Sequence, residues 1–246
     1  MAVVVNKKTA LGRQASVAGA IIAALFLVCL GLLWHAFHMH RYSRRFYVEA
    51  GIGFVLIIFL EQALNWAMIY IRGYDGERRV LRALRGLPDE YRILNDVTVK
   101  ADEDEAQIDH VVVSPYGLWC LETKSHRGMT FGKERDQNWT QVKHSERGRR
   151  YKSKLYSPIR QNETHCKRLS DFLKQHLGLS VPIRSVVVFS HGKFEVESVT
   201  PVVAPGGVLQ AMRPQGLAPV ISEADVTRIV RALLESGAAA AKPSVA

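Results

Sequence analysis

Cysteine is scarce in this chain of 246 residues, and its distribution excludes two classes of small protein. The three cysteines, Cys29, Cys120 and Cys166, are far apart, and no two of them have the spacing of a zinc ligand pair. They also give no disulfide framework of the kind that holds small secreted domains together. A hydrophobic core must therefore stabilise the fold, and a reducing compartment is the simpler expectation.

Charge is absent from residues 17–37, a run long enough to cross a bilayer about 30 Å thick at about 1.5 Å per residue. A cleavable signal peptide is the alternative, but the run is longer than a typical signal core and no small-x-small site follows it. A second apolar run, residues 50–71, contains Glu61, Gln62 and Asn65. Because a charge inside a membrane is costly, this run either crosses the membrane with Glu61 against a partner helix or lies in the interface.

Acidic residues are also rare near the two apolar runs, and the basic residues there predict an orientation. Before residue 72 there are six Lys/Arg and two Glu. Eight basic residues flank the expected transmembrane hairpin of residues 17–71, and three lie in its loop, so the rest of the chain should face the cytoplasm at the cell membrane. This anchor predicts membrane lipid as a partner, and a second copy of the chain bound through the two helices.

The densest chemistry lies in residues 108–124, which read as two apolar strands joined by turn residues at Ser114–Gly117. Asp109, Glu122 and Lys124 are charges that an apolar strand seldom carries. Side chains alternate along a strand, so Glu122 and Lys124 share a face, and in a hairpin Asp109 lies a diagonal step away. The pattern predicts two carboxylates and one ammonium group at one end of a sheet.

That arrangement suits phosphodiester hydrolysis. Asp109 and Glu122 would bind Mg²⁺ (or Mn²⁺), which lowers the pKa of a bound water and stabilises charge on phosphorus. Lys124 would position the attacking water or neutralise the developing charge. The alternative for these three residues alone is an exposed strand end with a Glu–Lys ion pair, which is common and contributes little to stability.

The motifs around this ribbon resemble the nuclease-related domain, NERD, of the restriction-endonuclease-like superfamily, whose signature is D…E-x-K. The resemblance runs from about residue 73 to about residue 177 and rests on six motifs in order. Ser157 departs from it, since the family usually has Asn before the Pro that follows, which we expect to affect a turn more than the chemistry. The motifs are Gly73–Glu77, Ile108–Gly117, Glu122–Lys124, Gly128 with Gly132, Trp139–Gln141, and Pro158 with Gln161, Asn162 and His165.

The resemblance implies an α/β fold with a mixed central sheet flanked by helices, in residues 72–236, after a basic N-terminal segment (1–16) and the transmembrane helical hairpin (17–37 and 50–71). Residues 237–246 have the composition of a disordered tail. Residue patterns predict strands at 91–99, 183–190 and 196–203, a further β excursion at 129–131 and 139–142, and helices at 76–85, 158–177 and 223–235.

The resemblance also implies two further catalytic residues. Glu77, in the first turn of the helix expected at 76–85, is either an additional acid of the site or a partner of the helix dipole. Gln161, at the start of the helix expected at 158–177, is implied to contact the metal-bound water or the substrate. His165 lies four residues later on the same helix face and is expected to be a core or supporting residue.

Residues 143–160 are expected to form a basic loop with one acid, Glu146, and two interleaved tyrosines, Tyr151 and Tyr156. Such a loop would follow the phosphates of a nucleic acid, and anionic lipid headgroups are the competing partner. The residues predicted to bind nucleic acid are Lys143, Arg147, Arg149, Arg150, Lys152, Lys154 and Arg160.

The sequence therefore predicts a membrane-anchored, metal-dependent nuclease that hydrolyses nucleic-acid phosphodiester bonds, with DNA favoured over RNA as the substrate. The alternative is a catalytically inactive nuclease-fold module that binds nucleic acid or a protein partner at the membrane. The intact set of Asp109, Glu122 and Lys124 favours the enzyme, because an inactive domain need not keep all three.

Overall fold

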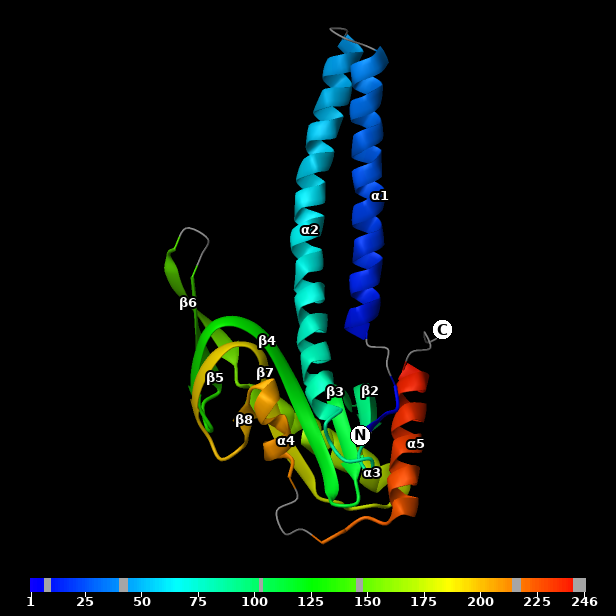
Figure 1. Cartoon of the computed structure of the whole chain (residues 1–246), viewed down its shortest axis with the longest axis vertical. Helices are drawn as coiled ribbons and strands as arrows, with labels where there is room; N and C mark the ends of the chain where they lie inside the picture. The colour runs from blue at the N-terminus through cyan, green and yellow to red at the C-terminus, as the bar shows by residue number, and fades with distance from the viewer. Residues whose placement is uncertain (7–9, 40–43, 102–103, 145–147, 214–217, 241–246) are drawn as a thin grey trace. The chain divides into compact units, whose positions relative to one another are not determined.

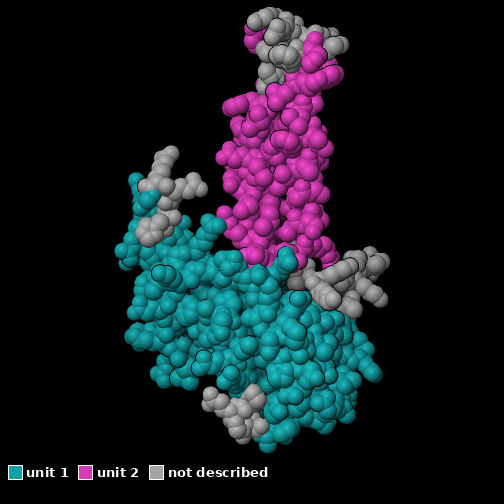
Figure 2. Space-filling view, viewed as in Figure 1, with its two compact units in different colours: residues 1–8, 76–246 teal, residues 9–75 magenta. Residues whose placement is uncertain are grey.

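A computed structural model of the chain describes residues 1–6, 10–39, 44–101, 104–144, 148–213 and 218–240 (Figure 1). The chain divides into two compact units (Figure 2). The first unit consists of residues 1–8 and 76–246, and the second consists of residues 9–75.

The second unit is formed by helix α1 (Ala10–Met39) and most of helix α2 (Arg44–Leu84). Each helix contains a stretch long and apolar enough to cross a membrane, Gly12–His35 in α1 and Gly51–Leu84 in α2. Only 11% of the most apolar window of each stretch is buried, whereas the core helix of a soluble protein is mostly buried. Both predicted apolar runs are therefore helices of membrane-spanning length and composition.

Helix α2 continues from the second unit into the first, so the separate helix expected at residues 76–85 does not exist. Gly73 and Gly76 lie inside it. A glycine in a helix interior costs only about 1 kcal/mol. Burial of Val80 and Leu84, both 0% exposed in the core of the first unit, outweighs that cost.

The first unit contains a mixed sheet of eight strands, as the fold prediction required. Six strands follow each other in space in chain order, with antiparallel pairing from β2 to β6 and a parallel β1. A seventh and an eighth strand extend the sheet by parallel pairing, β7 with β4 and β8 with β7. The strands are β1 (Val3–Val4), β2 (Arg92–Ala101), β3 (Asp104–Ser114), β4 (Gly117–Lys133), β5 (Asn138–His144), β6 (Arg150–Tyr156), β7 (Ile183–Glu197) and β8 (Val202–Val203).

Helices flank both faces of this sheet (Figure 1). On β3, Val111 and Val113 pack with the helices α3 and α5, whereas Val112 packs with the end of α2 and with α4. Alternate side chains of this buried strand thus pack into the cores on opposite faces of the sheet, which explains why its apolar run is nearly continuous. The helices of this unit are α3 (Pro158–Leu177), the 3₁₀ helix η1 (Pro205–Gly207), α4 (Val208–Ala211) and α5 (Glu223–Ala240).

The predicted hairpin is confirmed, with β3 and β4 joined at Ser114–Gly117 and Gly117 at a φ of +124°. Beyond Lys124 the ladder between β4 and β7 shifts register twice before pairing resumes at Met129. Two glycines with positive φ make this irregularity tight. A Cβ on Gly128 (φ +93°) would meet the Val142 carbonyl oxygen, and one on Gly192 would meet the His126 carbonyl oxygen.

Residues 143–160 are not the basic loop that was expected. They contain the end of β5, the strand β6 and the start of α3, and Arg147 lies outside the described residues. The high density of charge led to the prediction of a loop, but an edge strand such as β6 tolerates lysine and arginine on its exposed face. Other boundaries also differ from the expected ones. Strand β7 extends to Glu197, and only residues 202–203 form the next strand. Helix α5 extends to Ala240, into the stretch expected to be disordered.

The N-terminal residues are part of the first unit's sheet, which no local pattern predicted. Val3 and Val4 pair in parallel with Arg92 and Ile93. Asn6 Nδ2 donates to the Asn95 carbonyl oxygen at 2.6 Å, and the Asn95 amide donates to Asn6 Oδ1 at 2.7 Å. Both chain segments that flank residues 9–75 are therefore held by one sheet.

Candidate active site

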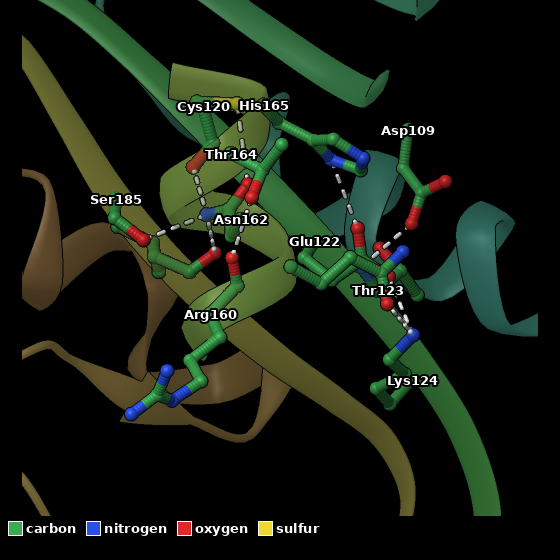
Figure 3. A network of polar contacts seen from close by, with 12 residues as sticks. Asp109, Cys120, Glu122, Thr123, Lys124, Arg160, Asn162, Thr164, His165 and Ser185 are labelled. Carbon is green, nitrogen blue, oxygen red and sulfur yellow. Dashed lines mark hydrogen bonds and ion pairs between the residues drawn. The ribbon is translucent and has the colours of Figure 1, made fainter. Parts of the chain in front are cut away.

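Strands β3 and β4 bring Asp109, Glu122 and Lys124 together, as the hairpin predicted (Figure 3). The register pairs the residue after Asp109 with the residue before Glu122. Asp109 Oδ2 accepts a hydrogen bond from the Thr123 amide at 2.7 Å, and Lys124 Nζ lies 2.6 Å from Glu122 Oε1. The three charges thus form one cluster at the point where β4 leaves the regular ladder.

Helix α3 closes this cluster with Gln161 and His165. Gln161 Oε1 accepts a hydrogen bond from Lys124 Nζ at 2.8 Å, and His165 Nδ1 lies 3.3 Å from Glu122 Oε2. Ser157 is the N-cap of α3, and its side chain accepts from the Arg160 amide, so the departure from the family pattern keeps the capping function. His165, expected only as a core or supporting residue, contacts a carboxylate of the site.

The neighbours of the two carboxyl groups separate their pKa values. Burial and the charge of Glu122 raise the pKa of Asp109 to about 7, against the opposing effects of the Thr123 amide and Lys124. Burial also acts to raise the pKa of Glu122, which is 2% exposed, but His165 and Lys124 together lower it. Glu122 is therefore the ionised partner at neutral pH, and Asp109 is poised between its two forms.

The donor set fits a divalent cation with oxygen ligands. Glu122 Oε2 is buried and has no partner within hydrogen-bond geometry among the described residues. Two carboxylates that repel each other in a buried site would both be stabilised by a cation. Across the described ranges there is no group of three or more His, Cys, Asp or Glu side chains arranged to hold a metal. A site with two carboxylates suits Mg²⁺, which keeps several of its waters, better than zinc.

Asn162 is a structural residue of the site whose role the sequence analysis missed. It is 0% exposed, and its Nδ2 donates to the Cys120 carbonyl oxygen and to Ser185 Oγ, each at 2.8 Å. Its Oδ1 accepts from Cys120 Sγ at 3.2 Å (Figure 3). These bonds attach α3 to β4 and β7. A polar residue beside the predicted Gln161 was the available signal, but only the packed structure shows its partners.

Glu77 lies close to the strands that carry the cluster. The preceding residue, Gly76, approaches so closely that an added Cβ would come within 2.6 Å of Ser190 Oγ and 2.8 Å of Ser125 Cβ. Ser125 directly follows Lys124 in β4. Glu77 is buried, at 9% exposed, and its assignment as an additional acid of the site stays a prediction.

The residues predicted to bind nucleic acid do not gather in the cluster. Three of them, Arg150, Lys152 and Lys154, are on β6, and Lys143 is on β5. The guanidinium group of Arg160, on α3, donates to the Arg135 carbonyl oxygen at 2.9 Å. Arg149 precedes β6, and its binding role, like that of the others, stays a prediction.

Comparison with known proteins gives a family for the part of the chain that carries the cluster. Residues 72–190 match the family model of the nuclease-related domain. Over 130 residues the chain is 35% identical to the uncharacterized protein pXO1-01 of Bacillus anthracis, a match that covers 52% of this chain and 57% of that protein. No solved structure matches. Residues 72–190 are thus similar to a nuclease-related domain, and this similarity indicates a nuclease-related function.

Proposed function

We propose that the first unit hydrolyses nucleic-acid phosphodiester bonds, with DNA as the expected substrate and Mg²⁺ or Mn²⁺ as the cofactor. The observation that carries this proposal is the convergence of Asp109, Glu122 and Lys124 in one cluster (Figure 3). Gln161 Oε1 accepts a hydrogen bond from the lysine of this cluster. The match of residues 72–190 to the nuclease-related domain supports it.

The chain's own residues have separable tasks in this reaction. Asp109 and Glu122 would hold the divalent ion, which supplies an acidified water and a Lewis acid. The ammonium group of Lys124, fixed by contacts with Glu122 and Gln161, is preorganised to stabilise negative charge that develops on the phosphoryl oxygens. His165, whose Nδ1 lies 3.3 Å from the second oxygen of Glu122, would orient that carboxylate.

The test is cleavage of plasmid and linear DNA by the full chain in detergent, with Mg²⁺, with Mn²⁺ and with EDTA. Lys124→Ala should slow cleavage by about 10²–10³-fold, because it removes one preorganised charge stabiliser. Lys133→Ala is the matched control, since Lys133 is also on β4 but has a side chain that is 66% exposed. The proposal would be contradicted if the wild-type protein failed to cut nucleic acid both with Mg²⁺ and with Mn²⁺.

One observation favours a second candidate, a nuclease-fold module that binds nucleic acid or a protein partner without cutting. The 2.6 Å ion pair with Lys124 already occupies Glu122 Oε1, which leaves only one oxygen of this carboxylate for a metal. In a binding module this pair would be permanent, and divalent metal would change neither the unfolding temperature nor the affinity for nucleic acid. Metal-dependent cleavage that Lys124→Ala abolishes excludes this candidate.

We further propose that α1 and α2 anchor the protein in the cell membrane with the first unit in the cytoplasm. The length and composition of both helices support anchoring, and the excess of basic residues outside the hairpin supports the orientation. The pairing of β1 with β2 adds a structural argument, because both flanks of residues 9–75 belong to one sheet. The intervening segment must therefore leave any membrane on the side from which it entered.

A further inference from the structure

Strand β6 carries its positive charge on one face. Side chains alternate along a strand, so Arg150, Lys152, Lys154 and Tyr156 project from the same side. All four are exposed, and the Tyr156 side chain is 48% exposed. We call the three basic residues the β6 cation stripe.

The edge position of β6 leaves this stripe accessible. In the sheet order β1 to β6, β6 is the terminal strand and pairs only with β5 on this path (Figure 1). The partners of Lys152 and Lys154 across the ladder are Val142 and Thr140. Strand β5 contains no acidic residue, so nothing on the adjoining strand neutralises the stripe.

A further basic residue of the hairpin of β5 and β6, Lys143, lies near the stretch of β4 that leaves the candidate active site. His126 follows Lys124 by two residues, and Lys143 is on β5. Burial, followed by the charges of Lys124 and Lys143, lowers the pKa of His126 to about 4, so both ammonium groups lie close to one imidazole ring. Lys143 therefore lies near the part of β4 that follows the cluster, and its partner across the ladder is Tyr151 of β6.

The spacing of the stripe suits one nucleic-acid strand. Alternate residues of a strand are about 6.7 Å apart, which is comparable to the separation of successive phosphates along a single chain of nucleotides. The exposed ring of Tyr156 continues the row and offers a face on which an unstacked base can lie. A duplex keeps its bases stacked inside and presents no such partner to the ring.

We infer that the β6 cation stripe and Tyr156 bind a single-stranded segment of nucleic acid, with the stripe on consecutive phosphates and the tyrosine on an unpaired base. The inference rests on the proposed function and narrows its substrate class to single-stranded nucleic acid, or to the single-stranded part of a larger molecule. A β ribbon in the major groove of a duplex is the competing geometry, and anionic lipid is the competing partner.

The experiment is fluorescence anisotropy with the full chain in phosphatidylcholine nanodiscs, in EDTA, with an oligonucleotide and its duplex of equal length. The single strand should bind more tightly than the duplex. Changing Arg150, Lys152 and Lys154 together to Gln should weaken its binding and reduce the slope of log affinity against log salt by about 2, because each lost phosphate contact contributes about 0.7. Tyr156→Leu should weaken single-strand binding about fivefold or more with the slope unchanged.

The matched control changes the same charge elsewhere: Lys167, Lys174 and Arg231, all exposed on α3 and α5, are replaced together by Gln. Equal losses in the two triple variants would overturn the inference, as would duplex binding as tight as single-strand binding. A stripe variant that binds nucleic acid normally but no longer retains phosphatidylserine vesicles would assign the stripe to lipid. Because binding is measured without metal, its result does not depend on cleavage by the candidate active site. The inference of single-strand binding and the proposal of hydrolysis can therefore be refuted separately.

Discussion

Asp109 takes up a proton near neutral pH because its carboxyl group is buried beside the charge of Glu122. Its pKa is about 7 in the folded protein and 3.8 as a free side chain, so between these values the folded state holds a proton that the unfolded state has lost. The contribution of Asp109 to stability is therefore full at low pH and is lost as the pH rises to about 7. Divalent cations should reverse this loss.

We expect Asp109→Asn to have a higher unfolding temperature than the wild type at pH 8 without metal, and an equal one at pH 4, because the substitution removes the repulsion from Glu122. Adding Mn²⁺ at pH 8 should raise the unfolding temperature of the wild type and leave that of Asp109→Asn unchanged. Thermal unfolding followed by fluorescence measures both effects. Asp89→Asn, at an exposed site, is the control; an equal Mn²⁺ shift in wild type and Asp109→Asn would refute the metal assignment.

His110 has the opposite pH dependence. Burial, against a smaller opposing effect of Glu122, lowers its pKa to about 4, and its Nδ1 contacts Asn95 Oδ1 at 2.8 Å. Between pH 6.5 and pH 4 the unfolded state binds a proton at His110 and the folded state does not. The contribution of neutral His110 to stability is therefore full above pH 6.5 and is lost as the pH falls toward 4. The loss should approach about 3 kcal/mol. His110→Gln should lose less stability between pH 7 and pH 4.5 in urea titrations, and an unchanged acid loss would contradict this account.

Asn162 should matter more for stability than any charged residue on its helix. Asn162→Ala removes the side-chain donor for the Cys120 and Val186 carbonyl oxygens and for Ser185, which should cost about 3 kcal/mol. Lys167→Ala, exposed on the same helix, should stay within about 0.5 kcal/mol of the wild type. Urea unfolding of the full chain in detergent compares the two, and similar losses would show that the attachment of α3 does not depend on this amide.

At the scale of elements, the irregular stretch of β4 directs the chain from the cluster to the hairpin of β5 and β6. Its shape depends on Gly128, whose Cβ would collide with the Val142 carbonyl oxygen, and on the bond from Gln141 Nε2 to the Arg127 carbonyl oxygen at 2.9 Å. Gly128→Ala must therefore both adopt an unfavourable φ and displace backbone of β5.

We expect Gly128→Ala to lower stability by several times the effect of Gly148→Ala, and to weaken single-strand binding by misplacing β6. Gly148 is the matched control because it also has a positive φ, +74°, but an added Cβ there meets nothing within 4 Å. Its substitution should cost about 1 kcal/mol from backbone strain alone. Thermal unfolding and anisotropy test this pair, and equal effects would show that the close approach at Gly128 can relax.

Local patterns were sufficient where an element depends on its own residues. The β3–β4 hairpin was predictable from the turn residues Ser114–Gly117, and α3 from Pro158 at its start and Gly178 just past its end. Local patterns did not predict β6, because its many cations were interpreted as a basic loop rather than as alternating residues of a strand. They did not predict β1 either, because its pairing depends on residues far along the chain. In the site, the residue spacing within the hairpin was enough to predict that Asp109 lies near Glu122. The contact of His165 with Glu122 could not be predicted in this way, because it requires the packing of α3 against the sheet.

At the scale of the whole molecule, the two apolar helices and the shared sheet predict a topology. A protease site inserted between Met39 and Arg44 should be cleaved by protease added outside intact cells, because the hairpin loop is expected to face outward. A site at the N-terminus and the first unit itself should resist. Disruption of the cells should expose all of them, which is the control. Digestion of the first unit in intact cells would overturn the cytoplasmic orientation.

The reciprocal bonds between Asn6 and Asn95 join residues 89 positions apart. At about 5–20 residues per second, the ribosome makes Asn95 about 5–20 s after Asn6. During that interval both apolar helices are synthesised while the residues of β1 have no strand to pair with. In the membrane-anchored protein that we propose, insertion of the helices would precede the closing of the sheet, and the later pairing of β1 with β2 would fix the inserted hairpin. After that pairing, neither end of such a hairpin would cross the bilayer unless the sheet first opened.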